Sequence, residues 1–337
     1  MIAEQLWDLA DSDRLLALHD FVPGVQILLK LEGLNPSGSI KLKTARQLVQ
    51  AAEASGRIGP GSRIIESSSG SLGIALASLA AARGYHMTVV TDPNASPRSI
   101  SHMRALGAEV LVVSQRDANG GFLQSRLKLL RQLLNSDPRI IWLNQYENPA
   151  NPEAHRLHTY QEIIDTCGDP DWLFIGAGTT GTLMGCMQGL TERGASTRLV
   201  AVDTAGSVTF GTPPGPRHIP GLGTSTRPPI FQDSPRLEKV HIEEIHAIRM
   251  CRRLARGSGI LVGGSTGTVL AAVAAMAPRF ASHSTVVAIS PDLGERYLDT
   301  IYEDGWVAER FGVKALDLDA PPKALVVSEA MATHRVR

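Results

Sequence analysis

The chain has 337 residues, of which 43% are apolar and 20% charged, and its 33 basic residues balance 33 acidic ones. This composition is typical of a soluble enzyme with one large domain or two medium ones. The zero net charge argues against nucleic acid or an anionic membrane as a partner. Neither a signal peptide nor an apolar run of roughly 18 residues is evident, so we expect a cytoplasmic protein that does not enter a membrane. The three scattered cysteines indicate neither a disulfide framework nor a metal site.

Apolar strand patterns alternate with helical patterns along most of the chain, which predicts parallel sheets with crossover helices. Strands are expected within residues 25–32, 62–70, 86–92, 108–114, 139–146, 171–176, 198–203, 260–267 and 285–292. Helices are expected at residues 43–56, 72–84, 96–107, 122–135 and 242–256, and after several of the later strands. A Pro- and Asn-rich seam near residues 148–152 suggests two such sheets, and the tail past about residue 315 has weak patterning. We therefore expect an α/β protein of two domains.

Four loops rich in Gly, Ser and Thr each lie where a strand ends and a helix begins. They comprise residues 35–41, 67–71, 176–182 and 263–268. Such junctions expose unpaired backbone N–H groups at a helix N-terminus, which favours anions. One such loop is common in an α/β protein. Four of them predict a ligand with several anionic groups, or a cofactor together with a substrate.

The third loop fits a dinucleotide-binding fingerprint. Residues 176–181 match G-x-G-x-x-G, and Asp203 follows about 20 residues later at the end of the next apolar run. By this pattern alone the protein is an NAD-dependent oxidoreductase. That interpretation explains neither Lys41 in the first loop nor Ser265 in the fourth.

Lys41 lies at the opening of a helix, directly after a Ser- and Gly-rich turn. The positive end of the helix and partial desolvation both lower the pKa of a lysine there, which suits an amine that forms a Schiff base. Taken alone, however, a lysine at a helix start is more often an ordinary solvated residue.

Six segments in order resemble the fold-type II pyridoxal-phosphate (PLP) enzymes of the cysteine synthase and cystathionine β-synthase family. KLEGLNPSGSIK resembles the segment that carries the cofactor lysine, ESSSGSLGIALA the substrate-carboxylate loop, and GAGTTGT the phosphate cradle. GILVGGSTGT resembles the segment whose serine meets the pyridine nitrogen, and NQYENPANPEAHRLHT and SPDLGERYLDT match two further stretches. The resemblance spans roughly residues 20–305. Each motif is weak alone, whereas six in order are specific.

The resemblance implies a tryptophan synthase β-like fold with pyridoxal 5′-phosphate as cofactor. It implies a smaller, mobile substrate-carboxylate domain at residues 44–150. Residues 1–43 and 151–315 are then the larger PLP-binding domain, followed by a loosely attached tail at 316–337. A homodimer that acts on small amino-acid substrates is the family expectation.

The resemblance also implies roles for individual residues. Lys41 is expected to hold the cofactor and then to remove the substrate Cα proton. Ser265 is expected to hydrogen-bond the pyridine nitrogen, and this neutral partner favours β-elimination over transamination. The phosphate is expected to be bound by Gly178, Thr179, Thr180, Gly181 and Thr182. The substrate carboxylate is expected to be bound by Ser68, Ser69, Gly70 and Gln145. Asp203 is then only a polar residue near the end of a strand.

Ser71 departs from the family pattern, which has an asparagine there in contact with the phenolic oxygen of the cofactor. A serine hydroxyl can donate the same hydrogen bond but reaches less far. The electronic tuning of the cofactor is therefore open. A PLP-fold protein that binds an amino acid or a partner without turnover is one alternative.

The expected reaction is β-replacement on an activated serine, through an aminoacrylate. The segments SSSG, TTGT, RHIPGLGTS and YLDTIYEDGW look most like one branch of the family. That branch makes N-(2-amino-2-carboxyethyl)-L-glutamate from O-phosphoserine and glutamate, for 2,3-diaminopropionate in siderophores and peptide antibiotics. A phosphate and a dicarboxylate both favour arginine, and Arg126 and Arg217 are candidates, with a solvated surface arginine as the alternative for each. Cysteine synthase is the other activity left open.

Two histidines in the fifth segment, His155 and His158, lie three residues apart on an expected helix. Metal binding needs more ligands than these two, and none is suitably spaced nearby. We expect a structural or solvated role for both.

Overall fold

The computed structural model describes residues 3–68, 70–117 and 121–326, whose strands form two sheets. The larger sheet has the order β1-β2-β10-β7-β8-β9-β11; its five inner strands run parallel, and β1 and β11 pair antiparallel at the two edges. Its strands are β1 (Leu15–Ala17), β2 (Gln26–Leu31), β7 (Trp172–Gly176), β8 (Arg198–Thr204), β9 (Leu237–Ile242), β10 (Thr285–Ser290) and β11 (Ala324–Val326).

The smaller sheet is wholly parallel, with the order β5-β4-β3-β6. Its strands are β3 (Arg63–Ser67), β4 (His86–Thr91), β5 (Glu109–Val112) and β6 (Ile140–Trp142). Helices α1 and α2 share one apolar core with α3 and with one face of this sheet, and α4 packs on the other face. These helices are α1 (Lys41–Ala54), α2 (Ser71–Arg83), α3 (Pro97–Ala105) and α4 (Leu123–Ser136).

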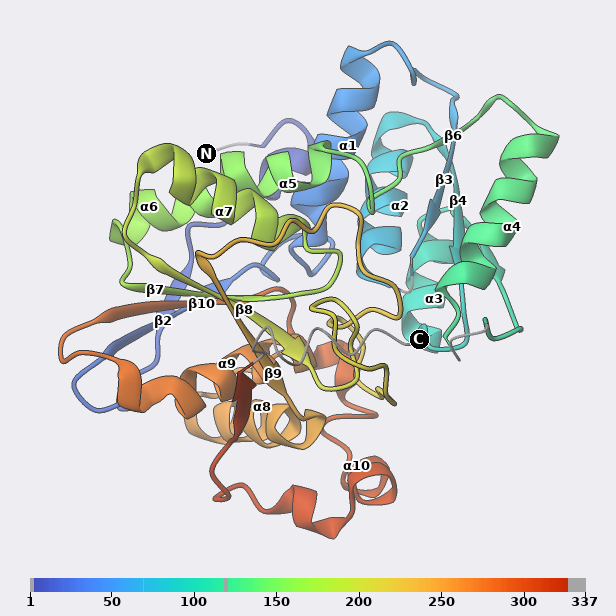
Figure 1. Cartoon of the computed structure of the whole chain (residues 1–337). Coiled ribbons are helices and arrows are strands. Elements are labelled where there is room, and N and C mark those ends of the chain that lie inside the picture. Colours follow the sequence, from blue (N-terminus) through green and yellow to red (C-terminus); the bar gives the residue numbers. More distant parts are fainter. Residues whose placement is uncertain (1–2, 69, 118–120, 327–337) are drawn as a thin grey trace.

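Both faces of the larger sheet are covered by helices. Successive side chains of a strand point to opposite faces, so each strand contributes apolar side chains to a core on either side. Trp172 and Phe174 on β7 pack in one core, and Leu173 and Ile175 pack in the other. Figure 1 shows α5, α6 and α7 above this sheet and α8 and α9 below it. The helices above are α5 (Ala150–Ala154), the π-helical turn η2 (His155–Tyr160), α6 (Gln161–Cys167) and α7 (Gly181–Arg193). Those below are α8 (Glu244–Ser258), α9 (Gly264–Met276) and, farther out, α10 (Asp304–Phe311).

Short 3-10 helices complete the described chain. They are η1 (Leu6–Leu9), η3 (Ala277–Arg279), η4 (Gly294–Tyr297) and η5 (Val313–Leu316). The predicted α/β class with parallel-rich sheets flanked by helices is confirmed. The predicted domain boundaries stay a prediction, although the seam at 148–152 falls at the start of α5. In the described part of the chain, no helix is both long and apolar enough to span a membrane.

Glycines let α7 lie unusually close to α5 and η2. A Cβ atom on Gly181 would come within 2.1 Å of Asn151 Oδ1, and one on Gly189 would come within 2.2 Å of the Tyr160 ring. Gly185, midway between them, would meet the backbone of the same segment at 2.2 Å. Because these glycines recur every four residues, they form one bare stripe along α7. Side chains of α5 and η2 can therefore reach the N-terminus of α7.

Candidate active site

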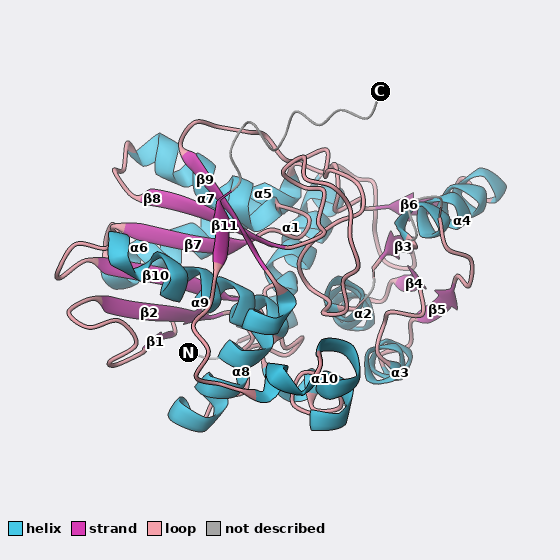
Figure 2. Cartoon of the chain, turned by 60° about the horizontal axis from the view of Figure 1, so that its bottom comes forward, coloured by secondary structure: helices cyan, strands magenta, loops and turns pink. Residues whose placement is uncertain are grey.

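Three of the four loops singled out in the sequence lie at the carboxyl ends of strands from both sheets. The strand expected within 260–267 is wrong, because Val262 forms only an isolated bridge with Leu293, and the fourth loop instead joins α8 to α9. The loop after β2 leads to α1, the loop after β3 leads to α2, and the loop after β7 leads to α7. Figure 2 shows these connections gathered between the two sheets. Ligands of open parallel sheets bind at this edge.

Lys41 is the first residue of α1, and its side chain is half-buried. Burial lowers the pKa of its amine to about 8, although the negative charge of Asp292 opposes the shift. A lysine with such a pKa is far more often unprotonated near neutral pH than a solvated one, as a Schiff-base amine must be. The charge of Lys41 in turn helps to lower the pKa of His155.

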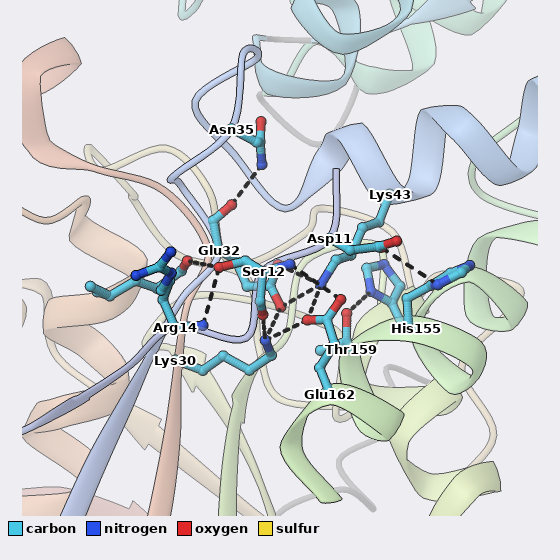
Figure 3. A network of polar contacts seen from close by, with 12 residues as sticks. Asp11, Ser12, Arg14, Lys30, Glu32, Asn35, Lys43, His155, Thr159 and Glu162 are labelled. Carbon is cyan, nitrogen blue, oxygen red and sulfur yellow. Dashed lines mark hydrogen bonds and ion pairs between the residues drawn. The ribbon is translucent and has the colours of Figure 1, made fainter. Parts of the chain in front are cut away.

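Two other lysines near Lys41 are fully committed to ion pairs (Figure 3). Lys30 Nζ lies 3.2 Å from Glu32 Oε1 and 2.6 Å from Glu162 Oε2. Lys43 Nζ lies 2.9 Å from Glu32 Oε2 and 2.6 Å from Glu162 Oε2. The two positive and two negative charges balance in a buried network that joins β2, α1 and α6. Of the three lysines in this region, Lys41 alone is left for chemistry.

Asp292, for which the sequence suggested no role, follows β10 directly and is buried beside Lys41. Burial raises the pKa of its carboxyl group, whereas the Tyr297 hydroxyl, which donates to Asp292 Oδ2 at 2.5 Å, lowers it. Ser265, in the first turn of α9, is buried and close enough to lower that pKa as well. The fold thus brings Ser265 and Lys41 to the same carboxylate.

The loop after β7 has the features of an anion cup. Thr180 precedes α7 with φ of 66°, a left-handed conformation that is strained for a β-branched residue. Its Oγ1 is buried and has no hydrogen-bond partner among the described residues. A Cβ on Gly178 would come within 3.0 Å of the Gly221 carbonyl oxygen, so the backbone there is closely covered. Gly181 and Thr182 supply amides in the first turn of α7, and the hydroxyl of half-buried Thr179 flanks the loop.

The loop before α2 is organised by two serines. Ser68 Oγ accepts hydrogen bonds from the amides of Gly70, at 3.2 Å, and Gly73, at 3.0 Å, and so satisfies one amide in the first turn of α2. Ser71 Oγ accepts a hydrogen bond from Arg296 Nη1 at 3.2 Å. Ser69, also expected in this loop, lies outside the described residues.

Gln145 lies beside the same loop and is buried. Its Nε2 donates to the Ser67 carbonyl oxygen at 2.9 Å, and its backbone amide donates to Glu66 Oε2 at 3.2 Å. Burial raises the pKa of Glu66 to about 7, against hydrogen bonds from Trp142 and from backbone amides. The structure thus places Gln145 at the carboxyl end of β3, where the predicted carboxylate loop begins.

Arg126 is 7% exposed, so the alternative of a solvated surface arginine is wrong. Its Nε lies 3.2 Å from Asp92 Oδ2, yet Nε and Nη1 have no hydrogen-bond partner in the described chain. Buried polar groups without hydrogen-bond partners are rare in proteins, and a catalytic or binding role is one explanation for them. Tyr146, which the sequence analysis did not single out, lies close enough for the charge of Arg126 to lower the pKa of its phenol against the larger effect of burial.

Arg217 lies in the long loop after β8 and is half-buried. Burial lowers the pKa of its guanidinium, and the charges of Asp203 and Glu244 oppose this. Asp203, one residue before the end of β8, accepts a hydrogen bond from the Thr204 amide at 2.7 Å. Burial raises the pKa of Asp203 to about 7. Its contacts are those of a buried residue that organises the following loop.

Comparisons with known proteins agree on one family. The sequence matches the family described as "Pyridoxal-phosphate dependent enzyme" over residues 14–292. It is 40% identical over 311 residues to an N-(2-amino-2-carboxyethyl)-L-glutamate synthase of Ralstonia nicotianae, covering 91% of this chain and 92% of the relative. It is also 40% identical over 287 residues to a protein of the same name from Cupriavidus metallidurans, covering 84% of each. The fold is similar to the crystal structure of O-ureido-L-serine synthase, with a TM-score of 0.83 and 31% identity over 91% of this chain and 100% of that one.

The residues brought together fit pyridoxal 5′-phosphate. The unpartnered buried hydroxyl of Thr180 and the amides of α7 suit its phosphate. Lys41 is within electrostatic reach of His155, which lies behind that loop, and of Asp292, which lies beside Ser265. These comparisons do not support an NAD site. The chain therefore belongs to the family of pyridoxal-phosphate dependent enzymes.

Proposed function

We propose that this enzyme replaces the phosphate of O-phospho-L-serine with the amine of L-glutamate, giving N-(2-amino-2-carboxyethyl)-L-glutamate. The Cβ–O bond breaks and its electron pair leaves with the phosphate. The glutamate nitrogen then forms the Cβ–N bond and loses a proton. The names of the relatives that cover most of the chain support this reaction.

The observation that carries the proposed substrate is Arg126. Arg126 Nη1 has no hydrogen-bond partner among the described residues, and its Nε has only the ion-pair contact with Asp92. Such a buried guanidinium is suited to a phosphate or carboxylate, which accepts several charge-assisted hydrogen bonds. Arg126 and Tyr146 lie near the carboxyl end of β3, where the proposed carboxylate loop begins. We assign Arg126 to the phosphate of the substrate.

Bound PLP supplies an electron sink that acidifies the substrate Cα–H bond. In this proposal the phosphate of the cofactor is held by Gly178, Thr179, Thr180, Gly181 and Thr182. Ser265 faces its ring nitrogen, and Ser71 lies near its phenolic oxygen. The Lys41 amine, whose pKa burial has lowered, accepts the Cα proton and later returns it.

The substrate is oriented by the smaller sheet in this proposal. Its α-carboxylate binds at the N-terminus of α2, to Ser68, Ser69, Gly70 and Gln145, where helix amides point outward. Arg217 is assigned to a carboxylate of the incoming glutamate, because its guanidinium is half-buried in the long loop after β8. These contacts also exclude water from the reacting carbon.

The test is to mix the purified holoenzyme with O-phosphoserine and glutamate and to measure released phosphate and the product mass. The expected result is stoichiometric phosphate and the glutamate adduct, with less turnover on O-acetylserine. Cysteine formed from sulfide while glutamate yields no adduct would favour the cysteine synthase alternative. Bound PLP with no phosphate release from any serine ester would favour a non-catalytic binding protein.

We also propose that the enzyme is a cytoplasmic homodimer, as the family resemblance implies. Light scattering of the holoenzyme should then give twice the mass of the 36.1 kDa chain. A monomeric mass would contradict the assembly without affecting the proposed reaction.

A further inference from the structure

We propose that Asn151 and His155 are positioning residues that turn the hydroxyl hydrogens of Thr179 and Thr182 toward the bound phosphate. The inference rests on the proposed role of residues 178–182 as the phosphate cradle. It concerns the layer behind that loop.

The two residues form a continuous buried network with the loop. His155 Nε2 lies 3.0 Å from Thr44 Oγ1 and 3.3 Å from Thr182 Oγ1, and its Nδ1 lies 3.0 Å from Thr159 Oγ1. Asn151 Nδ2 lies 3.3 Å from Thr179 Oγ1. Asn151, His155, Thr44 and Thr159 have no exposed surface. Water therefore does not reach these four side chains.

His155 is neutral in this setting and carries one ring proton. Burial lowers its pKa well below the usual range, and the charges of Lys41 and Lys43 lower it further. A phosphate dianion only accepts hydrogen bonds, so the Thr182 hydroxyl must donate its hydrogen to the phosphate. The lone pairs of Thr182 then require a donor from behind, and His155 Nε2 is the ring nitrogen that faces it. The ring proton is therefore assigned to Nε2, and Nδ1 accepts from Thr159.

Matching donors with acceptors in the same way fixes the direction of the hydrogen bonds around Asn151. Thr44 receives the shared Nε2–H of His155 and donates to Asn151 Oδ1 at 3.4 Å. The amide of Asn151 donates to the Gln145 carbonyl oxygen at 2.8 Å and to Thr179 Oγ1 at 3.3 Å. Thr179 accepts from behind and is free to donate forward. Every donor in this hydrogen-bond network has an acceptor. The hydroxyl groups of Thr179 and Thr182 then both point their hydrogens toward the phosphate.

The glycine stripe of α7 is what lets this layer exist. Asn151 and His155 are four residues apart and face Gly181 and Gly185, which are also four apart. A side chain on either glycine would displace the network. The stripe thus gives the phosphate loop a rigid polar backing instead of an apolar one.

The first measurement uses the wild-type holoenzyme labelled with 15N-histidine. The ring nitrogen shifts and couplings of His155, assigned by comparison with His155→Gln, should show a neutral ring protonated at Nε2. A ring protonated at Nδ1, or a doubly protonated ring, would overturn the assignment. This result does not depend on turnover.

The second measurement is the affinity of cofactor-free protein for PLP and for inorganic phosphate. His155→Leu and Asn151→Leu should each bind both about tenfold more weakly, since each leaves a hydroxyl free to turn away from the anion. His155→Gln, which keeps a donor, should recover part of the loss. His158→Leu is the matched control, because His158 lies on the same turn but contacts Asp11 and should bind as wild type.

The outcomes separate this inference from the proposals on which it depends. Folded His155→Leu and Asn151→Leu with wild-type affinity for both anions would overturn it. Thr182→Val that binds PLP as tightly as wild type would instead contradict the cradle itself. Neither result bears on which nucleophile the enzyme uses.

Discussion

Arg296 Nη1 donates a hydrogen bond to Ser71 Oγ at 3.2 Å and thereby joins the segment after β10 to the first turn of α2. Arg296 Nη2 also donates to the Ser37 carbonyl oxygen, in the loop that precedes Lys41. The serine that departs from the family pattern is thus an acceptor for an arginine that also contacts the loop between β2 and α1.

Ser71→Ala should lower the free energy of unfolding by only about 1 kcal/mol, because Arg296 keeps its contact with Ser37. Chemical denaturation of the holoenzyme measures this effect. Ser71→Thr, which keeps a hydroxyl able to accept from Arg296, is the control. A loss as large as that caused by breaking a buried ion pair would show that Arg296 depends on Ser71 alone.

Lys41→Met should abolish covalent attachment of the cofactor while leaving the fold intact. Borohydride reduction of the holoenzyme, followed by peptide mass mapping, should place the pyridoxyl label on Lys41 in wild type and nowhere in the variant. Lys43→Met is the informative contrast: it should keep the label but lose about 3–5 kcal/mol of stability, since Glu32 is left partly uncompensated. A label on Lys43 in either protein would contradict the assignment.

The stability of the cofactor-free protein should depend on Lys41 at alkaline pH. Burial lowers the pKa of this amine from its usual 10.5 to about 8, so between these values the unfolded chain binds more protons than the folded one. The contribution of Lys41 to stability therefore rises as the pH increases from about 8 toward 10.5 and is constant below that window. Urea unfolding at pH 7 and pH 10 (roughly either side of the rise) should show a larger gain for wild type than for Lys41→Met.

Arg126→Met should lower kcat/KM for O-phosphoserine about a hundredfold, because a charge-assisted contact to the phosphate is lost. Turnover of O-acetylserine, which lacks that phosphate, should change far less. Arg131→Met is the control on the same helix, since Arg131 is exposed. Equal losses on both esters would show that Arg126 supports the fold and does not select the substrate.

Thr180→Gly should have opposite effects on folding and on binding. Glycine relieves the φ of 66°, so the free energy of unfolding of the cofactor-free protein should rise by up to about 1 kcal/mol. PLP affinity should fall, because the unpartnered hydroxyl is lost. Asp203→Asn should leave PLP affinity unchanged, and a loss there would revive the interpretation of Asp203 as a ligand-binding acid.

The parts of the site that the sequence predicted are those held by local structure. Lys41 and the loop at 176–182 lie at strand-to-helix junctions, where the backbone itself creates the environment. For the candidate Arg126 the sequence left a solvated surface residue open as the alternative, because a charge on an amphipathic helix is buried only when distant segments cover it. Asp292 gave no signal beyond its place after an apolar strand.

His155 shows a different limit. Its spacing from His158 excluded a metal site, and its structural role was expected. What the sequence analysis missed was that α7 would bring it against Thr182. The four-residue spacing of Gly181, Gly185 and Gly189 is the sequence signal from which this close packing could have been predicted. Strands β9 and β11 were missed because charged residues interrupt LEKVHI and the tail is weakly patterned.

The backing of the phosphate loop comes mainly from α1, α5, η2 and α7, whereas the proposed contacts to the substrate come largely from the smaller sheet. Cofactor retention and substrate choice are therefore encoded in largely separate stretches of the gene. Random variation confined to residues 67–70 and 122–126 should yield proteins that still take up PLP yet differ in the serine esters they accept. The architecture thus makes this chain a practical starting point for directed evolution of new amine acceptors and leaving groups.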